Sequence, residues 1–374
     1  MSQIIYKAFK TRIYPTEEQI IYFNKCFGVS RFAYNWFLNE QKINYKNNTQ
    51  MSWKQSRDKF MNYRNQIPWI FEIKSRVYRY AQGDLMEAYD RFFKGKSNQP
   101  KFKSKKKKNK QSFSTDICKI LNKNLFYIVG SNFNNKGYKN NRIKIKTSED
   151  ISWLKNIFKI IISKQNNIYY VSFNYKEIVE EKDLYQNNFT KTVGIDLGLK
   201  TFATQSDNKI TKLPKQKIIK IENKIKVFQR VLSKKQRGSK NYYKVKTKLN
   251  KCYQKITNIK TDFLHKYTTW LCKNYKIIKI EDLNISGWLK NHKLTKSTSR
   301  SSLGTFRSML NYKTQWYDSN LIIIDKWYAS SKICSKCGNK KDKLKLSERV
   351  YICDKCELKM DRDLNAAINI SLFK

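Results

Sequence analysis

The sequence predicts a multi-domain α+β protein, with a β-rich N-terminal part that contains a helical module and a C-terminal α/β domain that carries paired cysteines. Three observations predict this organisation. Short β-branched runs in the first half are interrupted by segments with helical spacing, strands and helices alternate from about residue 191, and two Cys-x-x-Cys pairs lie near the end. The 374 residues allow two or three domains.

The chain begins with a predicted strand. Residues 3–13 alternate partly and are rich in β-branched residues, so we assign residues 1–13 to the first strand of an N-terminal β-barrel. Pro15 then ends the strand, and Thr16 with Gln19 has the spacing of a capping box. A helix should therefore follow, through about residue 39.

A helical module is predicted over residues 14–95, inserted between the first strand and the rest of the barrel. Apolar residues at helical spacing predict two more helices in it, over residues 51–65 and 72–94. The positions of the last helix that we expect to be buried are Val77, Tyr80, Leu85, Ala88 and Phe92.

Residues 96–185 are predicted to complete the barrel, because short alternating or β-branched runs are separated there by Asn and Gly. The clearest runs are 124–129, 142–146, 158–164 and 169–175. A basic loop precedes them, with seven Lys in the ten positions 101–110. A solvated loop would have this composition, but so would one that contacts phosphates, and the charge of the whole chain favours contact.

Residues 190–374 show the pattern of an α/β domain. A Lys-rich helical hairpin, broken near Gly238, is predicted within it over residues 215–274. The other predicted elements are strands at 192–198, 201–204, 209–212, 276–280 and 321–325, a helix at 303–318 and a last helix that begins near Asp361.

The charge of the chain points to a polyanionic partner. Lys and Arg number 78 and Asp and Glu 29, so the formal net charge is +49. Such a charge opposes compaction unless phosphates neutralise it, and it is far from that of an ordinary soluble domain. No long amphipathic stretch with a basic face indicates a membrane surface instead. Aromatic residues, 14% of the chain and often beside Lys or Arg, suit stacking on bases.

Two cysteine pairs predict a structural zinc site. Cys334 and Cys337 form one Cys-x-x-Cys, and Cys353 and Cys356 form the second. Four thiolates at this spacing can surround Zn²⁺ tetrahedrally and leave no open position, which favours a structural site over a redox pair. We therefore predict a zinc ribbon over residues 331–359, inserted in the α/β domain.

Three carboxylates at the ends of predicted elements are candidates for a second metal site. Asp196 lies in an apolar strand, Glu281 follows another, and Asp363 begins the last helix. Carboxylate oxygens select Mg²⁺ or Mn²⁺, the ions that phosphodiester hydrolysis uses. Each carboxylate alone is weak evidence: Asp363 or Asp361 could be a helix cap, and Asp282 could replace Glu281.

Several motifs resemble the TnpB family of transposon-encoded nucleases, the OrfB type, which is related to type V CRISPR effectors. Val-Gly-Ile-Asp-Leu-Gly-Leu-Lys-Thr-Phe-Ala-Thr (193–204), Ile-Glu-Asp-Leu-Asn (280–284) and Asp-Arg-Asp-Leu-Asn-Ala-Ala-Ile-Asn-Ile (361–370) are similar to the three RuvC motifs of that family. Residues 327–338 resemble the beginning of its zinc ribbon, and residues 10–19, 28–36 and 101–105 also match. The resemblance therefore extends over the whole chain.

The resemblance implies an RNase H-like (RuvC) nuclease domain in which Asp196, Glu281 and Asp363 are catalytic and bind Mg²⁺ or Mn²⁺. It implies an RNA-guided DNA endonuclease of a bacterial or archaeal transposon that cuts double-stranded target DNA beside a short flanking motif, by two-metal-ion hydrolysis. A guide RNA from the transposon end would pair with one strand. The alternatives are an accessory guide-RNA and DNA-binding regulator of transposition, or a DNA transposase. A tyrosine transposase would need a His pair, and His265 and His292 are not spaced as one.

The nucleic-acid contacts and the location of the protein are less determined by the sequence. We predict contacts from five basic residues, of which two lie on the third predicted helix and three in the basic loop: Lys74, Arg76, Lys103, Lys105 and Lys106. No signal peptide or membrane-spanning apolar run is visible, so we expect a cytoplasmic prokaryotic protein that acts at the nucleoid, with no membrane partner. We expect it to be a monomer.

Overall fold

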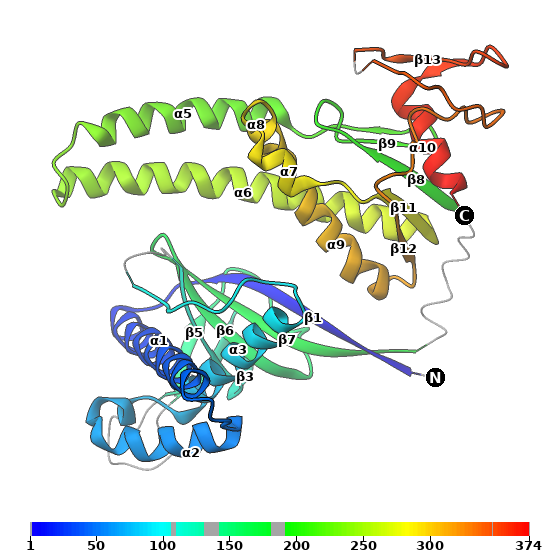
Figure 1. Ribbon diagram of the computed structural model, residues 1–374. Helices are drawn as coiled ribbons and strands as arrows, with labels where there is room; N and C mark the ends of the chain where they lie inside the picture. Colours follow the sequence, from blue (N-terminus) through cyan, green and yellow to red (C-terminus); the bar gives the residue numbers. More distant parts are fainter. Residues whose placement is uncertain (1, 106–109, 131–141, 181–190, 346, 374) are drawn as a thin grey trace. The chain divides into compact units, whose positions relative to one another are not determined.

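The computed structural model describes residues 2–105, 110–130, 142–180, 191–345 and 347–373 (Figure 1). The chain divides into two compact units, one of residues Ile4–Ile178 and one of Val179–Lys374 with the first three residues. Both units contain helices and strands, which confirms the prediction of a multi-domain chain of mixed α and β structure. No helix within the described ranges has the length and hydropathy that crossing a bilayer requires.

Two sheets form the β structure of the N-terminal unit. The first has the strand order β1-β7-β6-β2, so the first strand of the chain joins strands that follow the helical module, as the sequence predicts. The second has the order β3-β4-β5, and a single bridge between Ile13 and Thr147 connects the two. The strands are β1 (Ser2–Ile13), β2 (Lys110–Thr115), β3 (Cys118–Asn122), β4 (Leu125–Val129), β5 (Arg142–Lys146), β6 (Ile157–Gln165) and β7 (Ile168–Glu180).

The helical module lies between β1 and β2 in the chain. Its elements are α1 (Glu17–Lys46), α2 (Trp53–Tyr63), the short 3₁₀ helices Arg64–Gln66 and Pro68–Glu72, and α3 (Ser75–Phe93). The predicted capping box is present, since Thr16 accepts from the backbone of Gln19 and the Gln19 side chain accepts from the backbone of Thr16. Helix α1 continues past residue 39 to Lys46, and the side chains that it buries there are polar: Glu40, which pairs with Lys59, and Asn44.

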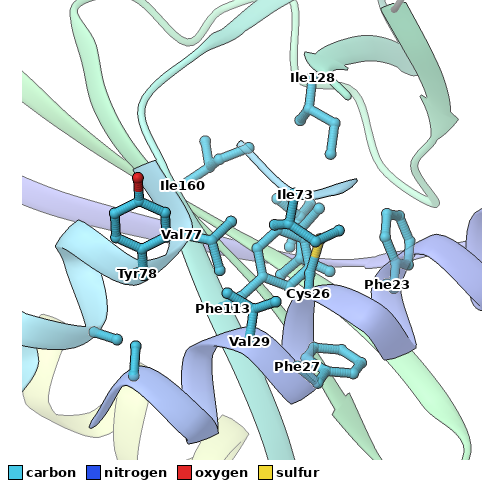
Figure 2. Close-up of a cluster of buried hydrophobic side chains, with 14 of the residues drawn as sticks. Phe23, Cys26, Phe27, Val29, Ile73, Val77, Tyr78, Phe113, Ile128 and Ile160 are labelled. Atoms are coloured by element: carbon cyan, nitrogen blue, oxygen red, sulfur yellow. The ribbon is translucent and has the colours of Figure 1, made fainter. Parts of the chain in front are cut away.

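The core of this unit is formed by α1, α3 and both sheets, since Figure 2 shows Ile128 of β4 with residues of α1, α3 and the first sheet. Phe23 and Phe27 of α1 pack on Phe113 of β2, with ring centroids 5.9 and 5.6 Å away. The predicted buried face of α3 was partly wrong. Val77 and Leu85 are buried, but Tyr80, Ala88 and Phe92 are only partly buried, and the face continues instead through Tyr78, Ala81 and Gln82.

A five-stranded sheet organises the C-terminal unit, in the order β10-β9-β8-β11-β12. Strand β8 pairs in parallel with β11, which pairs in parallel with β12, while β8, β9 and β10 run antiparallel. Strand β8, in the middle of the sheet, has most of its residues buried, which explains its apolar character, while β11 alternates between buried and half-buried residues. The strands are β8 (Thr192–Leu197), β9 (Ala203–Gln205), β10 (Ile210–Thr211), β11 (Ile277–Glu281) and β12 (Asn320–Ile324).

Helices connect and cover this sheet. The predicted hairpin is α5 (Lys215–Ser233) and α6 (Lys240–Asn274), which run side by side (Figure 1). Gly238 between them has φ +95°, a conformation that glycine adopts without strain. The remaining helices are α7 (Ile285–Lys290) and α8 (His292–Ser301), which the sequence analysis did not anticipate, then α9 (Leu303–Trp316) and α10 (Arg362–Leu372). The short strands β13 (Val350–Ile352) and β14 (Lys359–Asp361) pair antiparallel, with Cys353 and Cys356 in the turn between them, and α10 follows β14 directly.

Candidate active site

Two of the predicted carboxylates end neighbouring parallel strands. Ile195 of β8 pairs with Ile280 of β11, so Asp196 and Glu281 occupy the next position of each strand. The neighbouring Ile195, Leu197 and Ile280 are buried, and an apolar strand therefore brings each carboxylate to the same edge of the sheet. Parallel strands place their carboxyl ends at one edge, which is where open α/β sheets hold their ligands.

The third carboxylate belongs to α10, which packs tightly on β8. A Cβ atom on Gly194 would lie 2.1 Å from the carbonyl oxygen of Ala367 and 2.3 Å from the backbone nitrogen of Ser371. Only glycine allows the helix and strand to approach this closely. The packing fixes α10 over β8, and Asp363 in the first turn of α10 then adds to the electrostatic environment of Asp196.

The close approach at Gly194 gives a stability prediction. Gly194→Ala should destabilise the C-terminal unit by about 3 kcal/mol or prevent its folding, because the backbone of α10 would have to move away from β8. Chemical denaturation of the purified variant measures this. Gly304→Ala is the matched control, since its Cβ would meet no atom closer than 3.9 Å and alanine favours helix α9. Equal stability of Gly194→Ala and the natural protein would contradict the packing described here.

The charges of Glu281 and Asp363 act on Asp196. Burial, followed by the charges of Glu281 and Asp363, raises the pKa of Asp196 from 3.8 to about 8. Burial also raises the pKa of Glu281, while the Ser330 hydroxyl, which donates a hydrogen bond to Oε1 of Glu281, lowers it. Buried carboxylates whose charges raise the pKa of a neighbour are stabilised in their ionised form by a cation. Their oxygen donors are those that Mg²⁺ and Mn²⁺ prefer, so the donor set fits such an ion.

The alternative carboxylates have other partners. Asp361 is the N-cap of α10, since its Oδ1 accepts from the backbone N–H groups of Asp363 (2.9 Å) and Leu364 (3.0 Å). The Asp363 side chain is therefore not needed as the cap. Asp282 forms an ion pair with Arg307 of α9, on the other side of the chain from its neighbour Glu281.

Two arginines lie close to the carboxylates. Nη1 of Arg349 is 3.8 Å from Oδ1 of Asp363. The charge of Arg362 lowers the pKa of Asp196, against the larger effect of burial. Positive charge is therefore present beside the carboxylates. A metal ion bound by the carboxylates would hold a phosphate group near these arginines.

The four predicted cysteines gather at one point in the ribbon. The sulfur atoms of Cys334, Cys337, Cys353 and Cys356 all lie within 4.8 Å of one another. Cys334 and Cys356 are 3.6 Å apart, as are Cys337 and Cys353. A tetrahedral Zn²⁺ at about 2.3 Å from each sulfur separates them by roughly 3.8 Å, so the cluster has the dimensions of a zinc site.

The backbone around each pair is arranged for thiolates. The N–H of Gly338 donates to the carbonyl of Cys334 and that of Glu357 to the carbonyl of Cys353, which closes two similar turns. Backbone N–H groups of Cys356 and Lys355 lower the pKa of Cys353 and so favour its thiolate. In the described part of the ribbon, a small core supports these turns: Tyr351, Cys334 and Cys353 are buried, and Leu344, Cys356 and Leu358 pack against them partly buried.

The predicted nucleic-acid contacts lie in the N-terminal unit, apart from Lys106, which is outside the described residues. Lys74 and Arg76 begin α3, and Arg76 forms an ion pair with Asp116, at 3.4 Å. Lys105 is exposed. The binding of phosphates by these residues stays a prediction.

The basic loop is attached to α1 at its beginning. The Asn35 side chain donates to the Lys103 carbonyl at 2.9 Å and accepts from the Lys103 N–H at 2.8 Å. The ammonium group of Lys103 lies 3.7 Å from the centre of the Tyr34 ring, and that of Lys42 lies 4.7 Å from the Phe102 ring. This part of the loop therefore has a defined path along α1.

Sequence reasoning missed three polar residues that position the site: Ser330, Asn365 and Asn369. All three are buried, and each makes hydrogen bonds to the site or to the loop that precedes the first cysteine. Two asparagines four residues apart on an otherwise apolar helix were the available signal, because a buried amide requires partners.

Models of known families match three stretches of the chain. A helix-turn-helix domain of IS605-type OrfB proteins matches residues 1–50, the IS605-type OrfB family described as "Probable transposase" matches 174–292, and the "Cas12f1-like, TNB domain" matches 304–370. The last match includes all four cysteines and Asp363.

Known proteins are similar over nearly the whole chain. A protein of Streptomyces pristinaespiralis named "Putative RNA-guided DNA endonuclease" is 30% identical and aligns with 99% of this chain and 90% of its own. InsQ of Escherichia coli K12, with the same description, is 25% identical over 97% and 91%. A solved Cas12f1-sgRNA-target DNA complex aligns with 98% and 99% at 15% identity, with a TM-score of 0.36 that is too low to relate individual residues. By its full-length similarity to the first of these proteins, the chain belongs to the TnpB family, the IS605-type OrfB proteins.

Proposed function

We propose that this protein is an RNA-guided DNA endonuclease of a prokaryotic transposable element, which cuts target DNA beside a short flanking motif. The observation that carries the proposal is that Asp196 and Glu281 lie at the ends of neighbouring parallel strands, β8 and β11, and that the charge of Asp363 on α10 acts on Asp196. Two relatives that align over 90% or more of their own length are named RNA-guided DNA endonucleases, which supports it.

The strand order supports a nuclease domain of the RNase H-like type. Three antiparallel strands followed by two parallel ones, in the order β10-β9-β8-β11-β12, is the arrangement expected of that fold. A fold alone does not determine an activity. The carboxylates at the ends of its first and fourth strands, with a third from the last helix, are the part that indicates phosphodiester hydrolysis.

The three carboxylates would bind Mg²⁺ or Mn²⁺. When bound, such ions lower the pKa of a water molecule and stabilise the leaving oxygen of a phosphodiester. The chain itself contributes the position of each ligand. Gly194 allows α10 to approach β8, Ser330 orients Glu281, and Arg349 supplies positive charge beside Asp363.

The four cysteines would bind a structural Zn²⁺. The geometry of the sulfur cluster fits this ion, and four thiolates leave no position for a substrate. The ribbon has few buried apolar residues, so the metal would supply most of its folding free energy.

The net charge of +49 supports a division of labour between protein and RNA. Basic residues would bind phosphates without reading sequence, while base pairing between the guide RNA and one DNA strand would select the target. The protein would read the flanking motif directly. We propose that Lys74, Arg76, Lys103, Lys105 and Lys106 contribute to these contacts, and that the N-terminal unit holds the duplex of guide and target.

Cleavage of a DNA library tests the proposal. The protein, purified with an RNA from its own transposon end, is incubated in Mg²⁺ with plasmids that carry the matching target beside randomised flanking bases. We expect double-strand cleavage only where one short motif flanks the target, and only when RNA and target match. Joining of DNA ends instead of their hydrolysis would identify a transposase, and cleavage that ignores the RNA would identify a nonspecific nuclease.

A further inference from the structure

The loop between β12 and the first cysteine contacts the candidate active site through one side chain. Ser330 is 5% exposed, and its hydroxyl donates a hydrogen bond to Oε1 of Glu281, 49 residues earlier in the chain. A hydroxyl that donates to one carboxylate oxygen fixes the rotation of the carboxylate and leaves the second oxygen to face a ligand. Ser330 is three residues before Ile333 and four before Cys334.

The same loop is fastened to α10, the helix that carries Asp363. The Asn369 side chain donates to the carbonyl groups of Ser330 (2.7 Å) and Ile333 (2.6 Å). The Asn365 side chain donates to the Ile333 carbonyl (2.7 Å) and accepts from the Ser335 N–H (3.0 Å). Asn365 and Asn369 lie one turn apart on one face of α10 and are 0% and 3% exposed.

These bonds connect the zinc ribbon with two of the three carboxylates. From α10, two buried amides hold the loop that contains Ser330 and ends at Cys334, and Ser330 holds Glu281. Asp363 stands at the beginning of the same helix. A displaced loop would therefore leave Glu281 without its hydrogen bond and change its orientation relative to Asp363.

We propose that Ser330 is a positioning residue of the nuclease, which orients Glu281 for a divalent ion, and that the loop from Ser330 to Cys334 joins the folding of the zinc ribbon to the geometry of the metal site. This inference rests on the proposed function for the identity of the ion. It assigns to the ribbon a second role besides its own folding: the ribbon holds one end of the loop that shapes the active site.

Metal binding by three variants tests the inference. Ser330→Ala removes the hydroxyl, Ser330→Thr keeps it, and Ser331→Ala changes a neighbouring serine for which the described part of the chain shows no side-chain hydrogen bond. Mn²⁺ binding to each zinc-loaded, full-length protein is measured by titration calorimetry without DNA. Loss of a group that orients a metal ligand typically weakens binding by about 10–100-fold, so we expect Ser330→Ala to bind Mn²⁺ at least ~10-fold more weakly.

Zinc content and cleavage separate positioning from a structural role. We expect Ser330→Ala to keep its zinc and its thermal transition, and to require about tenfold more Mg²⁺ for half-maximal cleavage of the guided target. Ser330→Thr should restore both the Mn²⁺ affinity and the Mg²⁺ requirement, and Ser331→Ala should change neither. Unchanged Mn²⁺ affinity in Ser330→Ala overturns the inference, and so does loss of zinc with no rescue by threonine, which would make Ser330 structural.

The cleavage assay and the Mn²⁺ titrations separate an error in the proposed function from an error in the role of Ser330. If the natural protein cleaves no guided target, the function is wrong. The Mn²⁺ titrations would still decide whether Ser330 orients Glu281, since they require neither RNA nor DNA.

Discussion

Asp196→Asn should lower the rate of guided cleavage by at least ~1000-fold, while binding of the RNA and of the matching DNA should persist. The substitution keeps the shape of the side chain but removes the charge that a divalent ion needs at the end of β8. Phosphate contacts and base pairing, which hold the target, involve other parts of the chain. Cleavage rates and filter binding at the same Mg²⁺ concentration measure the two effects separately.

Asp282→Asn is the matched control, because Asp282 is the acidic residue next to Glu281 in the chain. Asp282 is adjacent to Glu281 but forms an ion pair with Arg307, and both partners are partly exposed. Asp282→Asn should therefore retain cleavage within a factor of about three, since exposed pairs contribute little. If Asp196→Asn cleaves as fast as Asp282→Asn, Asp196 is not a metal ligand.

Asp196→Asn should also stabilise the protein when divalent ions are absent. The pKa of Asp196 in the folded protein, about 8, is above its ordinary value of 3.8, so the folded state binds a proton more tightly than the unfolded state. Stability contributed by this group is therefore present at low pH and is lost as the pH rises from about 4 to about 8. At pH 7.5 in a chelator, Asp196→Asn should gain on the order of 2 kcal/mol, or several degrees in melting temperature.

The pH dependence of that gain is the check. It should shrink as the pH falls from about 8 and vanish below about pH 4, where the natural carboxyl group is protonated in the unfolded state as well as in the folded state. Added Mg²⁺ should also reduce the gain, by stabilising only the natural protein. A variant that is less stable than the natural protein at pH 7.5 without metal would contradict the raised pKa of Asp196.

Cys334→Ser is the second change with a large expected effect. Zinc content should fall to near zero, the ribbon over residues 331–359 should become sensitive to proteases, and cleavage should fall by at least ~100-fold. Three thiolates and a hydroxyl bind Zn²⁺ poorly, and the ribbon core is too small to fold without the metal. Cleavage falls as well because the loop that positions Glu281 ends at this cysteine.

A cysteine outside the cluster provides the comparison. Cys252 is a half-buried thiol of the α5–α6 hairpin, and Cys252→Ser should keep both zinc and cleavage. Metal analysis and limited proteolysis of the two variants measure the difference. An unchanged zinc content in Cys334→Ser would refute the four-cysteine site.

Much of the fold could be predicted from local patterns. Capping at Thr16, the glycine break at Gly238 and the apolar strands at 192–197 and 277–281 each depend on neighbouring residues, and the structure contains all of them. The cysteine pairs were equally clear, because a metal site requires fixed spacing within each pair. The specific arrangement of a barrel in the N-terminal unit stays a prediction, since its described strands form two sheets.

Other features depend on packing between distant segments and could not be predicted. The buried face of α3 is set by its packing against α1 and β2. This packing buries Tyr78 and Ala81 where the sequence predicted Tyr80. In the site, position 194 needs a glycine because a Cβ atom there would clash with the backbone of α10 at Ala367. Ala367 is more than 170 residues away in the chain. The contact of Ser330 with Glu281 is likewise visible only in the folded chain.

Sequencing of the RNA that purifies with the protein tests the central claim most directly. The protein is expressed from its own transposable element, with the downstream end of the element intact, and is isolated at a salt concentration that removes weakly bound RNA. Guided recognition predicts one discrete RNA whose sequence ends at, or crosses, the boundary of the element. A random sample of cellular RNA, or none, would contradict an RNA-guided nuclease and leave a basic metal-dependent nuclease or accessory binder in its place.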